Sequence, residues 1–112
     1  KNDKLLHIIY FDFDETSISE SGKRAIETFL KNNRNYIDGY LIVGHTDTKG
    51  SKKYNLNLSI KRANVVKDIF VENKVDISKI KILGEGEESL AIVTPDNTKH
   101  PANRRVEIKK SN

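Results

Sequence analysis

The 112-residue sequence contains no cysteine, and its longest apolar runs, LLHIIYF near the start and YLIVG near residue 40, are short. The lack of cysteine excludes a disulfide framework, a thiolate zinc site and a cysteine nucleophile. A membrane-spanning helix needs roughly 20 apolar residues, so neither run could cross a bilayer as a helix. No secretory leader pattern is visible, which predicts either a cytosolic protein or a fragment whose signal or anchor has been removed.

The sequence also lacks a strong excess of charge of one sign. Twenty Lys and Arg stand against 16 Asp and Glu, giving a formal net charge of +4, and the basic residues are scattered. This excess favours anionic partners such as nucleic acid, anionic lipid or wall polymers, without selecting among them. With 36% hydrophobic and 32% charged residues, the chain is too apolar and too periodic to be disordered. The length predicts one domain over residues 1–112.

Strand and helix signals alternate through the first half of the chain. Residues 5–11 form a continuous apolar run that is typical of a strand covered on both faces. Apolar residues recur at helical spacing over residues 25–30, and the pair Ser17 and Glu20 is a candidate capping box for this helix. Residues 40–43 are a second apolar run and predict the next strand.

The second half of the chain continues the alternation. Helical spacing returns from about residue 55 to residue 72, with Asn55 or Asn57 available as the N-cap. Residues 80–83 predict a third strand, and the alternation of residues 106–108 predicts a fourth.

These elements define the order strand, helix, strand, helix, strand, long loop, strand. Two consecutive strand–helix–strand crossovers of the usual right-handed kind place both helices on one face of the sheet, and the last strand can pair antiparallel. The sequence therefore predicts an α+β fold: a two-layer βαβαβ-β sandwich whose mixed four-stranded sheet carries two main helices on one face. The loop 84–103 is long for a compact domain and is a candidate site or mobile segment.

One charged residue interrupts the apolar face of the helix predicted over residues 55–72. On a helical wheel with Leu58 at zero, Arg62 falls at about 40°, inside the apolar stripe. An unpaired buried guanidinium costs several kcal/mol, so Arg62 needs either a carboxylate partner or a place at the helix edge where its head reaches water. A purely structural ion pair or a snorkelling arginine therefore remains an alternative to a binding role.

The context of Arg62 favours a binding role. The N-terminal turns of a helix attract anions, and Asp47 follows a strand end, where the binding sites of open α/β sheets gather. Arg62 could hold a carboxylate through its two-pronged guanidinium while Asp47 holds an ammonium group. This arrangement would suit the head group of an amino acid.

The segment GHTDTKGSKKYNLNLSIKRANVV resembles the OmpA-like peptidoglycan-binding domain, whose pattern runs roughly G-H-T-D-x-x-G-x3-Y-N-x2-L-S-x2-R-A-x2-V. The matching residues are Gly44, His45, Thr46, Asp47, Gly50, Tyr54, Asn55, Leu58, Ser59, Arg62, Ala63 and Val66. The segments FDFDETSI, GEGEESL and NRRVEI are similar to other motifs of this family, with Leu90 in place of its proline. The resemblance covers residues 10–108.

The resemblance implies a non-catalytic βαβαβ-β module that binds peptidoglycan, without a cofactor, and anchors a larger envelope protein to the cell wall. Asp47 and Arg62 would grip the ammonium and carboxylate of meso-diaminopimelate in the peptide stem. The same pocket would include Phe13, Asp14, Thr46, Asn55, Leu58, Ser59 and Arg105. The full-length protein would be periplasmic and attached to the outer or inner membrane by a segment absent from this sequence. The choice between Arg104 and Arg105, the type of anchor and the oligomeric state stay open.

Other chemistries have weaker support in the sequence. The basic pI and the lysine-rich KGSKK allow a nucleic-acid-binding domain, but the charge is scattered and only 7% of residues are aromatic. His45, Asp47 and Asp14 do not show the spacing of a metal site. Ser59 lacks the motif of a nucleophile, and GEGEE lacks the third glycine of a dinucleotide site. We therefore expect neither an enzyme nor a metal.

Overall fold

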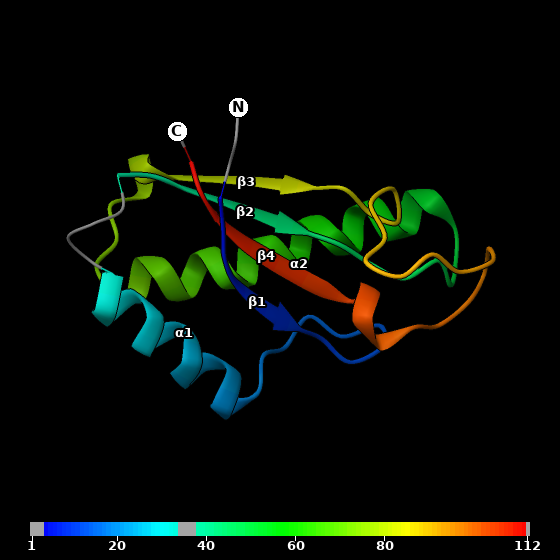
Figure 1. Cartoon of the computed structure of the whole chain (residues 1–112), viewed down its shortest axis with the longest axis horizontal. Helices are drawn as coiled ribbons and strands as arrows, with labels where there is room; N and C mark the ends of the chain where they lie inside the picture. Colours follow the sequence, from blue (N-terminus) through cyan, green and yellow to red (C-terminus); the bar gives the residue numbers. More distant parts are fainter. Residues whose placement is uncertain (1–3, 34–37, 112) are drawn as a thin grey trace.

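The computed structural model describes residues 4–33 and 38–111 (Figure 1). Its elements are β1 (Lys4–Tyr10), α1 (Glu20–Asn33), β2 (Tyr40–Gly44), α2 (Lys52–Glu72), the 3-10 turn η1 (Ile77–Lys79), β3 (Ile80–Gly84), the 3-10 turn η2 (Pro101–Asn103) and β4 (Arg105–Lys110). The single domain predicted over residues 1–112 extends at both ends beyond the described residues. No helix within residues 4–33 and 38–111 has the length and apolar character needed to cross a membrane.

The four strands form one mixed sheet in the order β1-β4-β2-β3. β2 and β3 are parallel, whereas β4 pairs antiparallel with both β1 and β2. Side chains of both helices and of the strands share one hydrophobic core, so the helices lie on the same face of the sheet (Figure 1). The predicted α+β architecture is confirmed, including the antiparallel pairing of the last strand, whose position between β1 and β2 the sequence did not predict.

The core lies between the central strands and the helices. Ile42 of β2 and Ile108 of β4 are buried opposite Ile26 of α1 and Val66 of α2. Successive side chains of a strand point to opposite faces, so the neighbours of these strand residues point to the face that carries no helix. The hydrophobic burial that stabilises the fold is thus concentrated on one side of the sheet.

The start of α1 differs from its predicted capping box. Glu20 is already the first helical residue, and the hydroxyl of Ser19 accepts a hydrogen bond from the backbone N–H of Gly22 at 3.0 Å. The candidate box formed by Ser17 and Glu20 is therefore wrong, because the capping side chain lies two residues further along the chain.

The start of α2 was also predicted too late. Ser51 is the N-cap, and its hydroxyl accepts from the backbone N–H of Tyr54 at 3.1 Å. Gly50 precedes it with a φ of 96°, a left-handed conformation that glycine adopts readily. The predicted caps at Asn55 and Asn57 are wrong, because both residues lie inside the helix.

The loop between β3 and β4 folds back on the loop that follows β2. The Thr48 hydroxyl donates to the Pro95 carbonyl at 2.8 Å, and the backbone N–H of Asn97 donates to the Thr48 carbonyl at 3.1 Å. The side chain of Asn103 exchanges two hydrogen bonds of 2.8 Å with the backbone of Ile92. These contacts bring the long loop to the same edge of the sheet as the end of β2.

Candidate functional site

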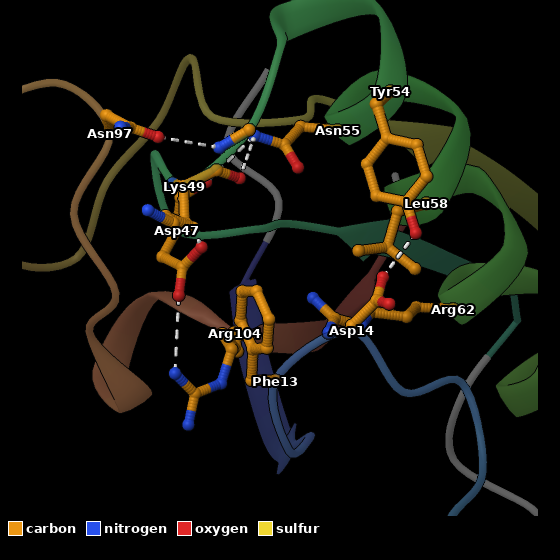
Figure 2. Close-up of a pocket in the computed structure, with 11 residues that line it drawn as sticks. Phe13, Asp14, Asp47, Lys49, Tyr54, Asn55, Leu58, Arg62, Asn97 and Arg104 are labelled. Carbon is orange, nitrogen blue, oxygen red and sulfur yellow. Dashed lines mark hydrogen bonds and ion pairs between the residues drawn. The ribbon is translucent and has the colours of Figure 1, made fainter.

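A cavity of about 250 Å³ opens beside the carboxyl end of β2 (Figure 2). Its walls come from the loop after β1, the loop after β2, the first turns of α2, the long loop and the residue before β4. The lining residues are Phe13, Asp14, Asp47, Lys49, Gly50, Tyr54, Asn55, Leu58, Arg62, Asn97 and Arg104. Carboxyl ends of neighbouring strands are where binding crevices form in open α/β sheets.

A close approach between β2 and α2 sets the geometry of this cavity. A Cβ atom on Gly44 would lie 1.9 Å from the carbonyl oxygen of Ser59, so only glycine allows this packing. Asn55 then fastens the loop after β2 to the helix. Its Nδ2 donates to the carbonyls of Asp47 at 3.3 Å and Lys49 at 3.1 Å, and to the Glu87 carboxylate at 2.9 Å. Asn55 is therefore a structural tie as well as part of the cavity wall.

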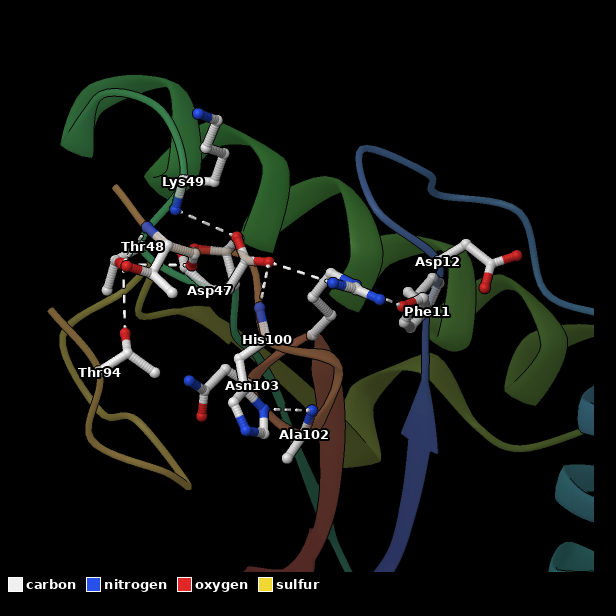
Figure 3. A network of polar contacts seen from close by, with 12 residues as sticks. Phe11, Asp12, Asp47, Thr48, Lys49, Thr94, His100, Ala102 and Asn103 are labelled. Carbon is white, nitrogen blue, oxygen red and sulfur yellow. Dashed lines mark hydrogen bonds and ion pairs between the residues drawn. The ribbon is translucent and has the colours of Figure 1, made fainter. Parts of the chain in front are cut away.

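Asp47 lies in this loop, and each of its two carboxylate oxygens has a partner within the protein (Figure 3). Its Oδ1 accepts from the backbone N–H of Lys49 at 3.2 Å, and its Oδ2 accepts from the backbone N–H of His100 at 3.1 Å. The guanidinium of Arg104 forms an ion pair with Oδ2 at 3.2 Å. The ion-pair partner of Asp47 is thus Arg104, whereas Arg62 forms no ion pair with Asp47.

Arg62 lies on the buried face of α2, as the helical wheel predicted, with an exposed fraction of 0%. Its guanidinium donates to three backbone carbonyls: Glu15 at 2.9 Å, His45 at 3.1 Å and Asp12 at 3.1 Å. It also lies 5.2 Å from the centre of the Phe11 ring. Carbonyl oxygens therefore satisfy this buried cation where a carboxylate was expected.

The charge of Arg62 persists at neutral pH. Burial lowers the pKa of its guanidinium to about 10, and the nearby carboxylates of Asp47 and Asp14 oppose that effect. Two further cations, Lys49 and Arg104, line the same cavity. The cavity therefore presents cationic and anionic groups together, which suits a ligand that carries both charges.

Six of the predicted site residues line this cavity. They are Phe13, Asp14, Asp47, Asn55, Leu58 and Arg62. Leu58 and Phe13 supply apolar surface beside the charged groups, and the Nζ of Lys99 lies 4.1 Å from the centre of the Phe13 ring. The hydroxyl of Tyr54 donates a hydrogen bond to the Asp14 carboxylate, which raises the pKa of Tyr54. These contacts join the loop after β1 to α2 and to the long loop at the mouth of the cavity.

The structure places Thr46, Ser59 and Arg105 outside the cavity walls. The Thr46 hydroxyl donates to the Asp47 carbonyl at 2.8 Å. The Ser59 hydroxyl donates to a carbonyl of its own helix and accepts from the backbone N–H of Gly86 at 2.9 Å. Thr46 and Ser59 thus brace the loops that shape the cavity.

The side chain of Arg105 points to the face of the sheet that carries no helix. Its Nε donates to the Glu107 carboxylate at 2.8 Å, and its Nη2 donates to the Ser89 carbonyl at 3.0 Å. The arginine at the cavity is Arg104, whose Nε also donates to the Phe11 carbonyl at 3.0 Å. The sequence contains the pattern that predicts this orientation. Successive strand residues point to opposite faces, and Val106 is a core residue, so its neighbour Arg105 must face away from the helices.

Residues His45, Glu85, Arg105, Glu107 and Lys109 form a second polar group, which we call the histidine cluster. Burial, followed by the charge of Arg105, lowers the pKa of His45 to about 4, so its ring is neutral at pH 7. The Glu107 carboxylate lies 3.7 Å from the ring and Glu85 lies 4.0 Å away. Within the described part of the chain, neither ring nitrogen of His45 has a hydrogen-bond partner, and no group of three or more metal-binding side chains occurs.

Comparisons with known proteins point to one family. The model of the OmpA family matches residues 10–104. The peptidoglycan-associated lipoprotein of Pseudomonas aeruginosa is 29% identical over 101 residues, covering 90% of this chain and 60% of that protein. An outer membrane protein of Gluconacetobacter diazotrophicus is 32% identical over 110 residues, covering 91% of this chain and 29% of that protein. This chain therefore spans less than two thirds of the length of these relatives.

Solved structures show the same fold. The peptidoglycan-associated lipoprotein from Burkholderia pseudomallei aligns with a TM-score of 0.79 and 27% identity, covering 93% of this chain and 89% of that chain. The C-terminal domain of Helicobacter pylori MotB aligns with a TM-score of 0.79 and 19% identity, covering 92% of this chain and 82% of that chain. At this identity the likeness supports the fold alone. Since the family match extends over most of the sequence, from the last residue of β1 to the residue before β4, this chain belongs to the OmpA family.

Proposed function

We propose that this chain binds peptidoglycan non-covalently, through the side chain of meso-diaminopimelate in the peptide stem. The observation that carries the proposal is the cavity in which Asp47 and Asp14 lie with Lys49, Arg62 and Arg104 beside an apolar wall. The end of a diaminopimelate side chain bears an ammonium and a carboxylate on a short aliphatic stem. The names of the relatives as peptidoglycan-associated lipoproteins support peptidoglycan as the polymer that is bound.

The proposed ligand fits the cavity in one orientation. Its ammonium group would meet the Asp47 carboxylate, while its carboxylate would lie toward the guanidinium groups of Arg62 and Arg104. The aliphatic stem would pack on Leu58 and Phe13. Thr46 and Ser59 would act by bracing the surrounding loops, as their hydrogen bonds indicate.

This role is a binding role without a chemical step. One such site would hold the wall with modest affinity, and many stems along the polymer would add avidity for a protein fixed to a membrane. We infer that the full-length protein is periplasmic and is attached to the outer or inner membrane by a segment outside this sequence. No specific feature of the cavity favours the alternative of nucleic-acid binding.

A calorimetric titration tests the proposal. A soluble muropeptide with meso-diaminopimelate should bind saturably, whereas its lysine-type counterpart, which lacks the second carboxylate, should bind much more weakly. Asp47→Ala should abolish binding, with Asp68→Ala, at an exposed position of α2, as the matched control. Equal binding of both muropeptides, or of neither, would contradict the proposal.

A further inference from the structure

The long loop between β3 and β4 contributes Asn97 to the wall of the cavity. This residue is exposed and lies beside Gly50, away from the arginines Arg62 and Arg104 (Figure 2). A peptide stem whose head group fills the cavity has to leave it across the exposed rim. Asn97 therefore lies where the stem could be contacted outside its charged head group.

The amide of Asn97 is held in one orientation. Its Oδ1 accepts a hydrogen bond from the backbone N–H of Gly50 at 3.2 Å. Its Nδ2 donates to no group within residues 4–33 and 38–111. The backbone φ of Asn97 is 56°, a left-handed conformation that asparagine adopts more readily than most residues. The side chain thus presents a fixed and unused N–H donor.

A neighbouring donor at the rim is already used. The hydroxyl of Tyr54, another exposed residue of the cavity wall, donates to the Asp14 carboxylate. The carbonyl oxygens of a bound peptide need N–H or O–H partners, because an unpaired polar group loses its hydrogen bonds to water on binding. The Nδ2 of Asn97 can supply such a partner without breaking a contact within the described residues.

Thr48 fixes the part of the long loop that carries Asn97 (Figure 3). Only 5% of Thr48 is exposed. Its hydroxyl donates to the Pro95 carbonyl at 2.8 Å and accepts from the backbone N–H of Thr98 at 2.9 Å. Its own carbonyl accepts from the backbone N–H of Asn97 at 3.1 Å. One buried residue thus holds the loop on both sides of Asn97.

We propose that Asn97 is a further ligand-binding residue of the cavity, that its Nδ2 donates to the carbonyl joining diaminopimelate to the preceding residue of the stem, and that Thr48 positions it. This inference rests on the proposed function. Free diaminopimelate lacks that carbonyl. Asn97 therefore distinguishes a stem peptide from the free amino acid.

Asn97→Gly removes the amide and suits the backbone, because glycine adopts a left-handed φ freely. It should lower the affinity for the meso-diaminopimelate muropeptide about three- to tenfold, as expected for the loss of one hydrogen bond. The affinity for free meso-diaminopimelate should change less than about twofold. Calorimetry measures both affinities.

Lys74→Gly is the matched control for this variant. Lys74 also has a left-handed φ, of 72°, and is exposed just after the end of α2 that lies away from the cavity. Its replacement should change neither affinity.

Thr48→Val keeps the branched shape of the side chain and removes the hydroxyl. It should weaken muropeptide binding over the same range, and Asn97→Gly added to it should cost less than about a further twofold, because residues that act through one another are not additive. Thr48→Ser retains the hydroxyl and should bind as the unaltered chain does. Circular dichroism should confirm that each variant is folded.

The two ligands separate the possible failures. Unchanged muropeptide affinity in Asn97→Gly, or an equal loss for free meso-diaminopimelate, would overturn the contact with the stem. Equal weakening of both ligands by Thr48→Val would overturn the positioning role, because the loop would then act on the head group. If the unaltered chain binds neither ligand, the proposed function fails and this inference fails with it. Normal binding by the unaltered chain with no effect of Asn97→Gly refutes this inference alone.

Discussion

Two buried arginines on opposite faces of the sheet are satisfied in different ways. Arg62, at the cavity, donates to three backbone carbonyls and lies near the carboxylates of Asp47 and Asp14 without a direct ion pair to Asp47. Arg105, in the histidine cluster, forms a direct ion pair with Glu107 at 2.8 Å. A guanidinium held by carbonyls keeps its positive charge uncompensated at close range. Only the first arrangement leaves a cation whose field can attract an anionic ligand.

Replacement of Arg62 should have the largest effect. Arg62→Met leaves the carbonyls of Asp12, Glu15 and His45 without their donor, which should lower the free energy of unfolding by about 3 kcal/mol or more and abolish muropeptide binding. Urea denaturation and calorimetry measure the two effects. Arg105→Met should cost about 2 kcal/mol and leave muropeptide binding intact, because its side chain lies outside the cavity. Equal loss of binding in both variants would remove the distinction between the two arginines.

Replacement of Asp47 should affect binding more than stability. Asp47→Asn keeps the shape of the side chain but removes the charge that pairs with Arg104. We expect muropeptide affinity to fall on the order of a hundredfold, since one member of a buried charged contact is lost. Asp68→Asn is the control, and calorimetry on both variants gives the comparison. Normal binding by Asp47→Asn would show that the ligand ammonium is held elsewhere.

The histidine cluster should make stability depend on pH. The pKa of His45 is about 4 in the folded chain and near the ordinary 6.5 when unfolded, so the unfolded chain binds more protons between these values. The free energy of unfolding is therefore highest above pH 6.5. It decreases by roughly 2–3 kcal/mol as the pH falls toward 4, because protonation of His45 favours the unfolded chain.

Urea denaturation from pH 7 to pH 4 measures this loss. His45→Gln should show a shallower decline than the unaltered chain. His7→Gln, at the half-buried histidine that stacks on Phe29, removes a second ring whose pKa is lowered by burial, and it should reduce the decline less than His45→Gln does. An identical pH dependence in His45→Gln would assign the decline to other groups.

The contact between Lys99 and Phe13 should give the smallest effect. Its Nζ lies 4.1 Å from the ring centre at an exposed position. Lys99→Ala should lower the free energy of unfolding by about 0.5 kcal/mol and change muropeptide affinity less than about twofold. Thermal denaturation and calorimetry check both values. A larger loss of affinity would place Lys99 in the binding site itself.

The sequence predicted the elements well and their ends less well. Apolar spacing identified four strands and two helices, because each pattern depends on residues close together in the chain. The caps at Ser19 and Ser51 were missed, since several polar residues near each helix start could cap and only the traced backbone selects one. Six of the predicted pocket residues lie at one cavity, and of Arg104 and Arg105, between which the sequence left the choice open, Arg104 lines it.

The sequence by itself determined the order of the elements, the burial of Arg62 on α2 and the presence of Asp47 at a strand end. Helical and strand periodicity are local properties, so these features can be read without the fold. Only the tertiary structure decided which arginine pairs with Asp47 and which groups satisfy Arg62. The carbonyls of Asp12, Glu15 and His45 meet at one point because the loops after β1 and β2 converge on α2. Every residue has a backbone carbonyl, so no pattern of side chains in the sequence could have predicted which carbonyls meet at Arg62.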